Sequence, residues 1–582
     1  MAEGRPSRLR TVFKVLLFLM FLFMAPIVVA IFIGTKMAPE QHVVEKGTVL
    51  ELNLAGELAE APEDPLLAKF FGGTGTSLWQ IRESLRKAAA DPNVAALRLT
   101  IGPLEMGWGE LQELVSELDT FRASGKPVHA LLRTDLISDA EYYLATGADR
   151  IWLSPGTGAV VNGLAIEVTF WRGTLEKLHV VPEILMFKEY KSAGEPFKNK
   201  EMSPYMREAM EAVLSDIQAE FITRVAERRK LEPVAVATFL AQGIQSAGEL
   251  KSSGLVDELG YDDQLEDALA AIAGVDTYAG LNLADYDPKQ PAVVNPDAAT
   301  LALIFGEGPI VSSEGQGGLF NRGDSVISGP DVAAAFRTAT DDDDVKAIVF
   351  RVNSPGGSPV GSDLIWREIQ RAKQAGKPVI VSMSTLAGSG GYWVAMGADA
   401  IVAQPTTITG SIGVLFTKFD ISGLFEWAGA HVDTVKTSPS ANIISLNEPL
   451  NPETQARAEA WLDSTYQAFT GKVAEGRNLP LDEVQNIAKG RIWSGRDALE
   501  LKLVDQLGGL DAAITLAREK GSLRPDAEIV IYPEHKTLAE RLLSGDFNMG
   551  AFTQAPDTNL LILARELAAP QVRVEMPGMS IR

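Results

Sequence analysis

The stretch Leu386-Ala387-Gly388-Ser389-Gly390-Gly391-Tyr392-Trp393 predicts a sharp corner between a strand and a helix. The preceding residues Gly376–Met383, GKPVIVSM, are typical of a helix end followed by a buried strand, and Val394–Asp399 continues as an apolar helix. At such a corner the hydroxyl of Ser389 can share one turn with the backbone N–H groups of an oxyanion hole. Taken alone, a turn of small residues is more often a loop without chemistry.

The chain repeats itself with an offset of about 250 residues, as its own segments show. Val94 and Val345 occupy equivalent places and are 251 residues apart, and Tyr142 and Tyr392 are 250 residues apart. The matching segments occur in the same order in both halves: Asp91–Leu99 with Asp342–Phe350, Ser124–Val128 with Ala375–Val379, Tyr142–Asp149 with Tyr392–Asp399, and Pro155–Gly163 with Pro405–Gly413. Two halves therefore share one fold.

Each half alternates strands with helices, which implies largely parallel sheets covered by helices. The α/β pattern is clearest in the second half. Strands are predicted at Leu301–Phe305, Ala347–Val352, Val379–Met383 and Ala400–Ala403, and helices at Val360–Gln374 and Gly391–Met396. A longer helical region follows in each half, at Pro204–Glu227 and Pro452–Glu475.

A chain of 582 residues is too long for one hydrophobic core. We predict a basic tail, membrane anchor and linker over residues 1–46, an N-terminal repeat over 47–295, and a C-terminal repeat over 296–540. Residues 541–582 form a C-terminal tail of unknown role, and helices are expected at Leu538–Leu543 and Leu560–Leu567.

The composition excludes several classes of function. A net charge of −23 repels phosphates, so no nucleic acid partner is expected. The chain has no cysteine, which excludes disulfides, cysteine-bound zinc and a cysteine nucleophile. Its five histidines show no metal-binding spacing, so we expect no metal and no cofactor.

An apolar run at Val15–Gly34 is long enough to span a membrane as a helix. Basic residues precede it, which places the N-terminus in the cytoplasm and the rest of the chain on the far side. The run is longer than the core of a cleaved signal peptide, so we favour an uncleaved anchor.

The two halves differ at the residues that could carry chemistry. Asp139 stands in the first half where the second has Ser389. The pair Gly356-Gly357, whose unobstructed N–H groups suit an oxyanion, corresponds to Glu105-Met106. The second half therefore kept a candidate nucleophile and its oxyanion donors, which the first half lacks.

The first half carries Lys191, which has no clear lysine counterpart in the second. A serine nucleophile needs a base, and burial can lower the pKa of a lysine from about 10.4 towards about 7–8. Most lysines are solvated surface residues, so the position alone does not decide the role.

Four motifs together resemble the S49 serine peptidases, in the long, duplicated form of the signal peptide peptidase A group. They are Tyr190–Phe197 (YKSAGEPF), Asn353–Ser358 (NSPGGS), Ser389–Trp393 (SGGYW) and Thr409–Gly413 (TGSIG). The resemblance runs from the anchor to about residue 540. It departs slightly at Gly388, where relatives often have alanine, a change that adds no bulk beside the nucleophile.

This resemblance implies tandem ClpP/crotonase-like domains and a serine endopeptidase with a Ser/Lys dyad. Ser389 would be the nucleophile, Lys191 the general base and Ser411 the residue that positions the lysine. The oxyanion donors would be the N–H groups of Gly356 or Gly357, with Gly390. The resemblance also implies a homotetramer, anchored in the bacterial inner membrane with its catalytic domains in the periplasm, that degrades cleaved signal peptides and similar hydrophobic peptides.

Three alternatives remain at this point. A ClpP-type Ser/His/Asp peptidase would use His129 or His431 as its base. A crotonase-like acyl-CoA enzyme also uses paired N–H donors, but coenzyme A is cytoplasmic. A catalytically inactive scaffold for membrane proteins would need none of these residues to meet.

Overall fold

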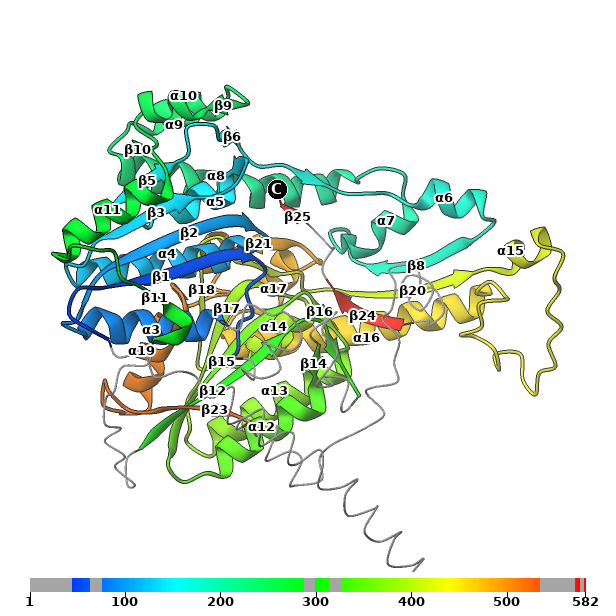
Figure 1. The fold of residues 1–582 in the computed structure, drawn as a ribbon. Coiled ribbons are helices and arrows are strands. Elements are labelled where there is room, and N and C mark those ends of the chain that lie inside the picture. The colour runs from blue at the N-terminus through cyan, green and yellow to red at the C-terminus, as the bar shows by residue number, and fades with distance from the viewer. Residues whose placement is uncertain are drawn as a thin grey trace, which may run out of the picture.

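The computed structural model describes residues 44–62, 76–286, 299–313, 326–533, 571–575 and 580–581. Figure 1 shows two α/β halves packed against each other, with the first half in blue to green and the second in green to orange. The described part of the chain contains no helix long and apolar enough to cross a membrane. The predicted anchor at Val15–Gly34 and the predicted helices at Leu538–Leu543 and Leu560–Leu567 lie outside the described residues.

The first half is built on a parallel sheet in the order β10-β5-β3-β2-β1-β11. Its strands are β1 (Thr48–Gly56), β2 (Val94–Leu104), β3 (Val128–Leu132), β5 (Arg150–Leu153), β10 (Glu258–Leu259) and β11 (Gly280–Asn282). The helices of this half are α3 (Leu78–Ala90), α4 (Trp108–Ala123), α5 (Asp139–Ala145), α8 (Pro204–Arg229), α9 (Pro233–Leu240), α10 (Ala247–Ser252) and α11 (Asp262–Ala273). A small sheet joins β4 (Leu136–Ser138), β6 (Gly158–Val160) and β9 (Gln245–Ser246).

The second half repeats this plan. Its sheet has the order β21-β19-β17-β15-β12-β23, with β18 and β22 continuing from β17. The strands are β12 (Thr300–Glu307), β15 (Val345–Ser354), β17 (Val379–Gly388), β18 (Ala400–Ala403), β19 (Ile408–Gly410), β21 (Ile492–Ser494), β22 (Gln506–Leu507) and β23 (Ile529–Tyr532). The helices are α12 (Gly329–Asp341), α13 (Pro359–Gln374), α14 (Gly390–Ala395), α16 (Pro452–Arg477), α17 (Leu481–Ile487), α18 (Gly495–Glu500) and α19 (Leu510–Lys520).

The duplication predicted from the sequence is confirmed element by element. Helices α4 and α13 have 16 residues each and begin 251 residues apart, and α8 and α16 have 26 residues each. The chain therefore contains tandem α/β domains, as expected.

The local sequence explains why α13 forms. Ser358 caps its first turn by accepting the N–H of Gly361, while Ile365 and Ile369 are fully buried against the sheet.

One strand is longer than predicted, and the difference bears on the site. We expected the strand to end at Met383, but β17 continues to Gly388, directly before Ser389. Its second part pairs with β19, with Leu386 opposite Ile408 and Gly388 opposite Gly410. The small residues at this end can stay in strand conformation because the neighbouring strand supplies their hydrogen bonds.

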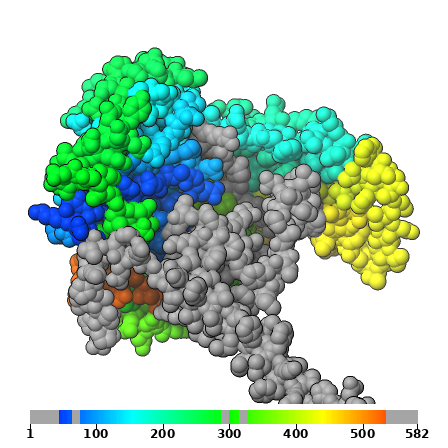
Figure 2. Space-filling model, viewed as in Figure 1, coloured from blue at the N-terminus to red at the C-terminus, as the bar shows by residue number. Residues whose placement is uncertain are grey.

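A third sheet ties the two halves together. Strand β8 (Val181–Phe187) of the first half pairs antiparallel with β20 (Val414–Asp420) of the second, with Phe187 opposite Val414. The same sheet continues in the order β14-β13-β16-β24-β20-β8, with β14 (Ile327–Ser328), β13 (Ile310–Val311), β16 (Gly356–Gly357) and β24 (Gln571–Glu575). With α6 (Arg172–Lys177) and α15 (Ser422–Trp427), strands β8 and β20 form an arm that extends from one end of the molecule (Figures 1 and 2).

The halves also pack closely through α4 of the first half, which lies on β17 of the second. A Cβ atom on Gly109 would lie 2.7 Å from the carbonyl oxygen of Ser384, so only glycine allows this approach. Next to this contact lies a buried ionic cluster. Arg351 of β15 is fully buried and donates to Glu60 at 3.0 and 3.1 Å and to Glu113 at 3.3 Å. An arginine of one half is thus neutralised by carboxylates of the other.

Two further carboxyl groups near this cluster have raised pKa values. Burial, together with the Glu60 charge, raises the pKa of Glu110 to about 8 and that of Glu307 to about 7. Both groups hold their proton more tightly in the folded chain than in the unfolded one. The stability that these two groups contribute is therefore fully present below about pH 4.5, and it is lost as the pH rises through the folded pKa values.

Glu307→Gln is expected to flatten the pH dependence of stability between pH 5 and 8. Glutamine can still accept the Glu60 N–H that now donates to Glu307 at 3.3 Å, but it carries no buried charge. At pH 8 the variant should gain roughly 1–3 kcal/mol in the free energy of unfolding, and at pH 5 it should match the wild type. Urea denaturation at both pH values measures this, with the exposed Glu453→Gln as control; a gain of equal size at both pH values would contradict the argument.

Candidate active site

Ser389 lies at the corner between β17 and α14, as predicted from its stretch. The residue is fully buried and its backbone has φ = 56°, a left-handed conformation that is unusual for a residue with a side chain. Its N–H donates to the carbonyl of Gly410 at 2.8 Å, and its own carbonyl accepts the N–H of Trp393 at 2.8 Å. These bonds hold the strained turn, and with it the side chain, in one position.

Lys191 reaches Ser389 from the other half of the chain. Phe187, the last residue of β8, lies opposite Val414, so the residues after β8 run beside the residues before β20. The Lys191 side chain is 1% exposed, and its Nζ lies 2.7 Å from Ser389 Oγ. Nζ also lies 3.0 Å from both the hydroxyl and the carbonyl oxygen of Ser411. The structure thus brings together the three residues Lys191, Ser389 and Ser411.

The sequence analysis missed the glycines that make room for the lysine. A Cβ atom on Gly490 would lie 2.5 Å from the Lys191 nitrogen, and one on Gly413 would lie 3.2 Å from Lys191 Cδ. Next to them, the Tyr190 N–H donates to the carbonyl of Lys489 at 3.1 Å. Gly413 belongs to a motif noted in the sequence, but nothing in the sequence singled out Gly490 among 52 glycines.

The candidate oxyanion donors lie against the serine turn. Gly356 and Gly357 have φ = 110° and 145°, which favours glycine. A Cβ atom on Gly390 would lie 3.1 Å from the Gly357 nitrogen, so these two residues face each other across a small gap. The Gly356 N–H donates to Ser354 Oγ at 3.1 Å. Gly357 is therefore the better-placed donor of the glycine pair.

Neither candidate histidine contacts the serine in the described part of the chain. His129 lies within β3 and stacks on Trp152, with 6.4 Å between ring centroids, and its burial lowers its pKa. His431 is exposed. The basic atom that Ser389 Oγ meets is the Lys191 amine.

Comparison with known proteins agrees with the repeat. The model of peptidase family S49 matches residues 120–276 and again residues 371–524, one match in each half. The chain belongs to peptidase family S49. As an S49 peptidase it is similar to the chloroplastic serine protease SPPA of Arabidopsis thaliana, with 32% identity over 92% of this chain and 78% of that one. It is also similar to Protease 4 of Salmonella typhi, with 32% identity over 88% of this chain and 84% of that one.

Among solved structures, a ClpP1 mutant from Listeria monocytogenes aligns with 36% of this S49 peptidase and 94% of its own length. The sequence identity is 13% and the TM-score is 0.23. The tandem α/β architecture is seen in the structure of the chain itself, while the likeness to ClpP and crotonase domains stays a prediction.

The first half of this S49 peptidase has no serine at the position that corresponds to Ser389. Asp139 occupies the place of the serine and accepts the N–H groups of Asn162 and Gly163 at 3.3 and 3.2 Å. Burial raises the pKa of Asp139 to about 6. Asp139 thus accepts hydrogen bonds from the backbone of its own half, whereas Ser389 contacts Lys191 from the other half.

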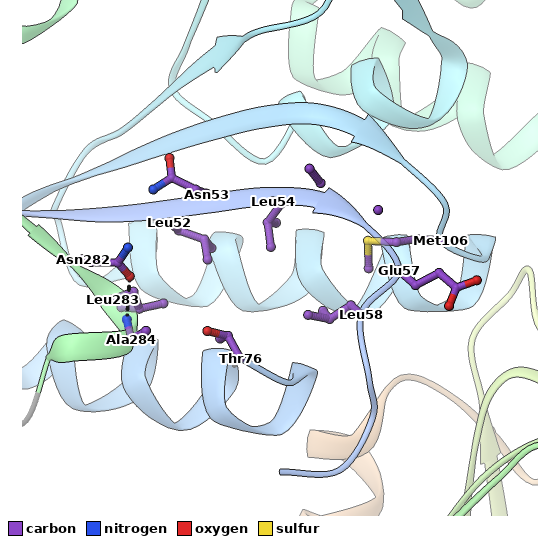
Figure 3. Close-up of a pocket in the computed structure, with 12 residues that line it drawn as sticks. Leu52, Asn53, Leu54, Glu57, Leu58, Thr76, Met106, Asn282, Leu283 and Ala284 are labelled. Carbon is purple, nitrogen blue, oxygen red and sulfur yellow. Dashed lines mark hydrogen bonds between the residues drawn. The ribbon is translucent and has the colours of Figure 1, made fainter. Parts of the chain in front are cut away.

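Met106, which stands where the second half has Gly357, lines a cavity of about 260 Å³ in the first half. Figure 3 shows Met106 near Glu57 and Leu58, with Leu52 and Leu54 along the same wall. The lining is mostly apolar and includes none of the predicted catalytic residues.

Proposed function

We propose that this S49 serine peptidase is a membrane-anchored endopeptidase that uses a Ser389/Lys191 dyad to degrade cleaved signal peptides and similar hydrophobic peptides. The observation that carries the proposal is the distance of 2.7 Å between Lys191 Nζ and Ser389 Oγ, in a place where the lysine is 1% exposed. Burial disfavours the ammonium form of a lysine and so favours the neutral amine that a general base requires.

In the proposed mechanism, neutral Lys191 takes the proton of the Ser389 hydroxyl as the serine oxygen attacks a peptide carbonyl. The new C–O bond gives a tetrahedral oxyanion, and Lys191 then gives its proton to the leaving amine as the C–N bond breaks. Water hydrolyses the acyl-enzyme by the same proton transfers. Ser411, whose two oxygens lie 3.0 Å from Nζ, would hold the amine in line with Ser389.

The proposed oxyanion hole consists of the N–H groups of Gly357 and Gly390. The Ser389 N–H already donates to Gly410, and the Gly356 N–H donates to Ser354, so neither is directed to the substrate. Two backbone donors held in a rigid turn stabilise the developing negative charge without having to reorganise.

Gly390→Ala is expected to lower kcat about a hundredfold with little change in KM. The added methyl group would lie 2.8 Å from Ser362 Oγ and 3.1 Å from the Gly357 nitrogen, so it displaces the proposed donor. Steady-state peptide hydrolysis measures the effect. The control is Gly471→Ala in α16, where a Cβ atom meets nothing within 4 Å. Equal activity of the two variants would exclude Gly357 and Gly390 as the oxyanion donors.

The support for a membrane anchor and for the proposed substrate class comes from the sequence and from the family resemblance. The apolar run at Val15–Gly34 supports an anchor in the bacterial inner membrane, with the N-terminus in the cytoplasm and the two repeats in the periplasm. Cleaved signal peptides are hydrophobic and remain in the membrane, so an anchored enzyme would meet them there.

A homotetramer is part of the same proposal. Large apolar side chains are exposed at the end of the arm, which favours contact with another copy of the chain. They include Trp171, Trp427, Val435 and Ile444.

Hydrolysis of a synthetic signal peptide in detergent micelles by the full chain tests the proposed function. We expect the wild type to cleave it, Ser389→Ala to be inactive, and His129→Ala and His431→Ala to stay active. Loss of activity in either histidine variant would favour the Ser/His/Asp alternative. A folded wild type that cleaves neither this peptide nor a polar one of equal length would favour the inactive scaffold.

A further inference from the structure

Strand β17 is irregular shortly before Ser389. Along its pairing with β15, the residue opposite Val352 is Met383, whereas the residue opposite Ser354 is Ala387. One residue of β15 therefore faces three residues of β17, and these three form a bulge. The bulge sets the direction from which the chain enters the serine turn.

The side chain of Asn353, the single residue of β15 at this place, bridges the bulge. Its Oδ1 accepts the N–H of Leu386 at 3.1 Å, which replaces a partner that the regular strand pairing no longer provides. Its carbonyl oxygen accepts the N–H of Gly308 at 2.9 Å, so the end of β12 holds its backbone in place. Asn353 also lies directly before the segment that leads to β16, the glycine pair. One side chain therefore connects the strand before the nucleophile with the segment that carries the proposed oxyanion donor.

The other end of the Asn353 side chain contacts the first half of the chain. Its Nδ2 donates to Oε1 of Glu110 at 2.9 Å, and Glu110 is buried in α4. The second oxygen of Glu110, Oε2, accepts the N–H of Gly107 at 2.8 Å and so closes the first turn of α4. The Glu110 N–H donates to Oγ1 of Thr385, within the bulge, at 3.2 Å. Glu110 thus contacts the bulge both directly and through Asn353.

The polarity of this chain of contacts admits few residue types. It begins at one backbone N–H donor, that of Gly107, and ends at another, that of Leu386. Two side chains lie between these donors, so one of them must accept at both ends while the other donates at one end and accepts at the other. A carboxylate at position 110 with an amide at position 353 meets this requirement, and so does the reverse pair. Two amides would always leave two N–H groups facing each other.

We infer that Glu110 and Asn353 are positioning residues for the peptidase reaction, which hold the bulge of β17, and through it Ser389, in place against the proposed oxyanion donors. The inference rests on the function proposed above for Ser389. Because both side chains act through the backbone of β17, they affect the chemical step and not the binding of substrate. The first half then has a second part in the reaction, besides supplying Lys191.

Exchanging the two side-chain types in the full chain tests this inference. Glu110→Gln places two N–H donors face to face, so we expect kcat for peptide hydrolysis to fall at least about tenfold with KM unchanged. Adding Asn353→Asp restores the polarity with the types exchanged, so the double variant should recover kcat to within about twofold of the wild type. Burial raises the pKa of Glu110 to about 8, so the assays are run at about pH 9, where its carboxylate accepts at both oxygens.

The matched control is Glu249→Gln at the start of α10. Glu249 also closes the first turn of its helix, by accepting the N–H of Ser246 at 2.7 Å, but it is exposed. This variant should keep the kcat of the wild type. A wild-type kcat in Glu110→Gln would overturn the inference, and so would a loss that the double variant does not recover.

Amide hydrogen exchange separates this inference from the proposed function, because it needs no catalysis. In the Ser389→Ala background, peptides that cover residues 384–391 should exchange at least about fivefold faster with Glu110→Gln than without it. Adding Asn353→Asp should return the exchange to its original rate. This result would support the inference even if the wild type hydrolysed no peptide. Equal exchange in all three chains would overturn it.

Discussion

Lys191→Met is expected to reduce kcat for peptide hydrolysis by at least about a thousandfold, with little change in KM. Methionine fills the space of the lysine stem but has no amine to take the proton of Ser389, whose Oγ now lies 2.7 Å from Nζ. Because the substitution removes a buried polar group, the variant is expected to fold. Steady-state kinetics on a hydrophobic peptide, with circular dichroism as the check of folding, measures the effect.

The control for this prediction is Lys188→Met, three residues earlier. Lys188 is exposed, and its Nζ lies over the Phe187 ring at 4.5 Å. This variant should keep kcat within about twofold of the wild type. If Lys191→Met retained similar activity, the base would lie elsewhere and the histidine mechanism would return.

Arg351→Met is expected to produce the largest loss of stability, about 3–5 kcal/mol in the free energy of unfolding at pH 8. Glu60 and Glu113 are each 2% exposed, and without the guanidinium their charges would stay buried with no counterion from β15. The loss should be smaller at pH 5, because a buried carboxyl without a partner binds a proton more readily. Urea denaturation monitored by tryptophan fluorescence measures both values.

The matched control is Arg457→Met on α16. Its ion pair with Glu453 has both side chains 75% exposed, so water screens it and no measurable change is expected. A loss of equal size in both variants would mean that the cost comes from the arginine side chain itself. The buried ion pairs of Arg351 with Glu60 and Glu113 would then not be the source of the lost stability.

The strands, helices and duplication could be predicted because they depend on short-range patterns. Val379–Met383 is a mostly apolar run, and Ile365 and Ile369 have helical spacing. Both elements are observed. The corner at Ser389 could be predicted because small residues lie between a predicted strand and a predicted helix. The comparison of the halves identified Gly356-Gly357 and Ser389 as features of one half only.

The pairing of the two halves could not be predicted from those patterns. Nothing local to Phe187 or Val414 indicates that their strands pair, because register between distant strands depends on the whole assembly. Lys191 was singled out because the second half has no matching lysine, and the family resemblance implied its role. Gly490, the glycine that makes room for it, was not identified. In the sequence, nothing distinguishes Arg351 from an ordinary charged residue within a strand. Only the folded structure shows that it lies beside Glu60 and Glu113.

Covalent labelling of Ser389 tests the cross-half dyad most directly. The full chain is incubated with a peptidyl phosphonate that reacts with activated serines, and the adduct is located by peptide mass mapping. The account predicts one adduct per chain, on Ser389, with a labelling rate at least about a thousandfold lower in Lys191→Met and unchanged in Lys188→Met. An adduct on another residue, or labelling of Lys191→Met at the wild-type rate, would contradict it.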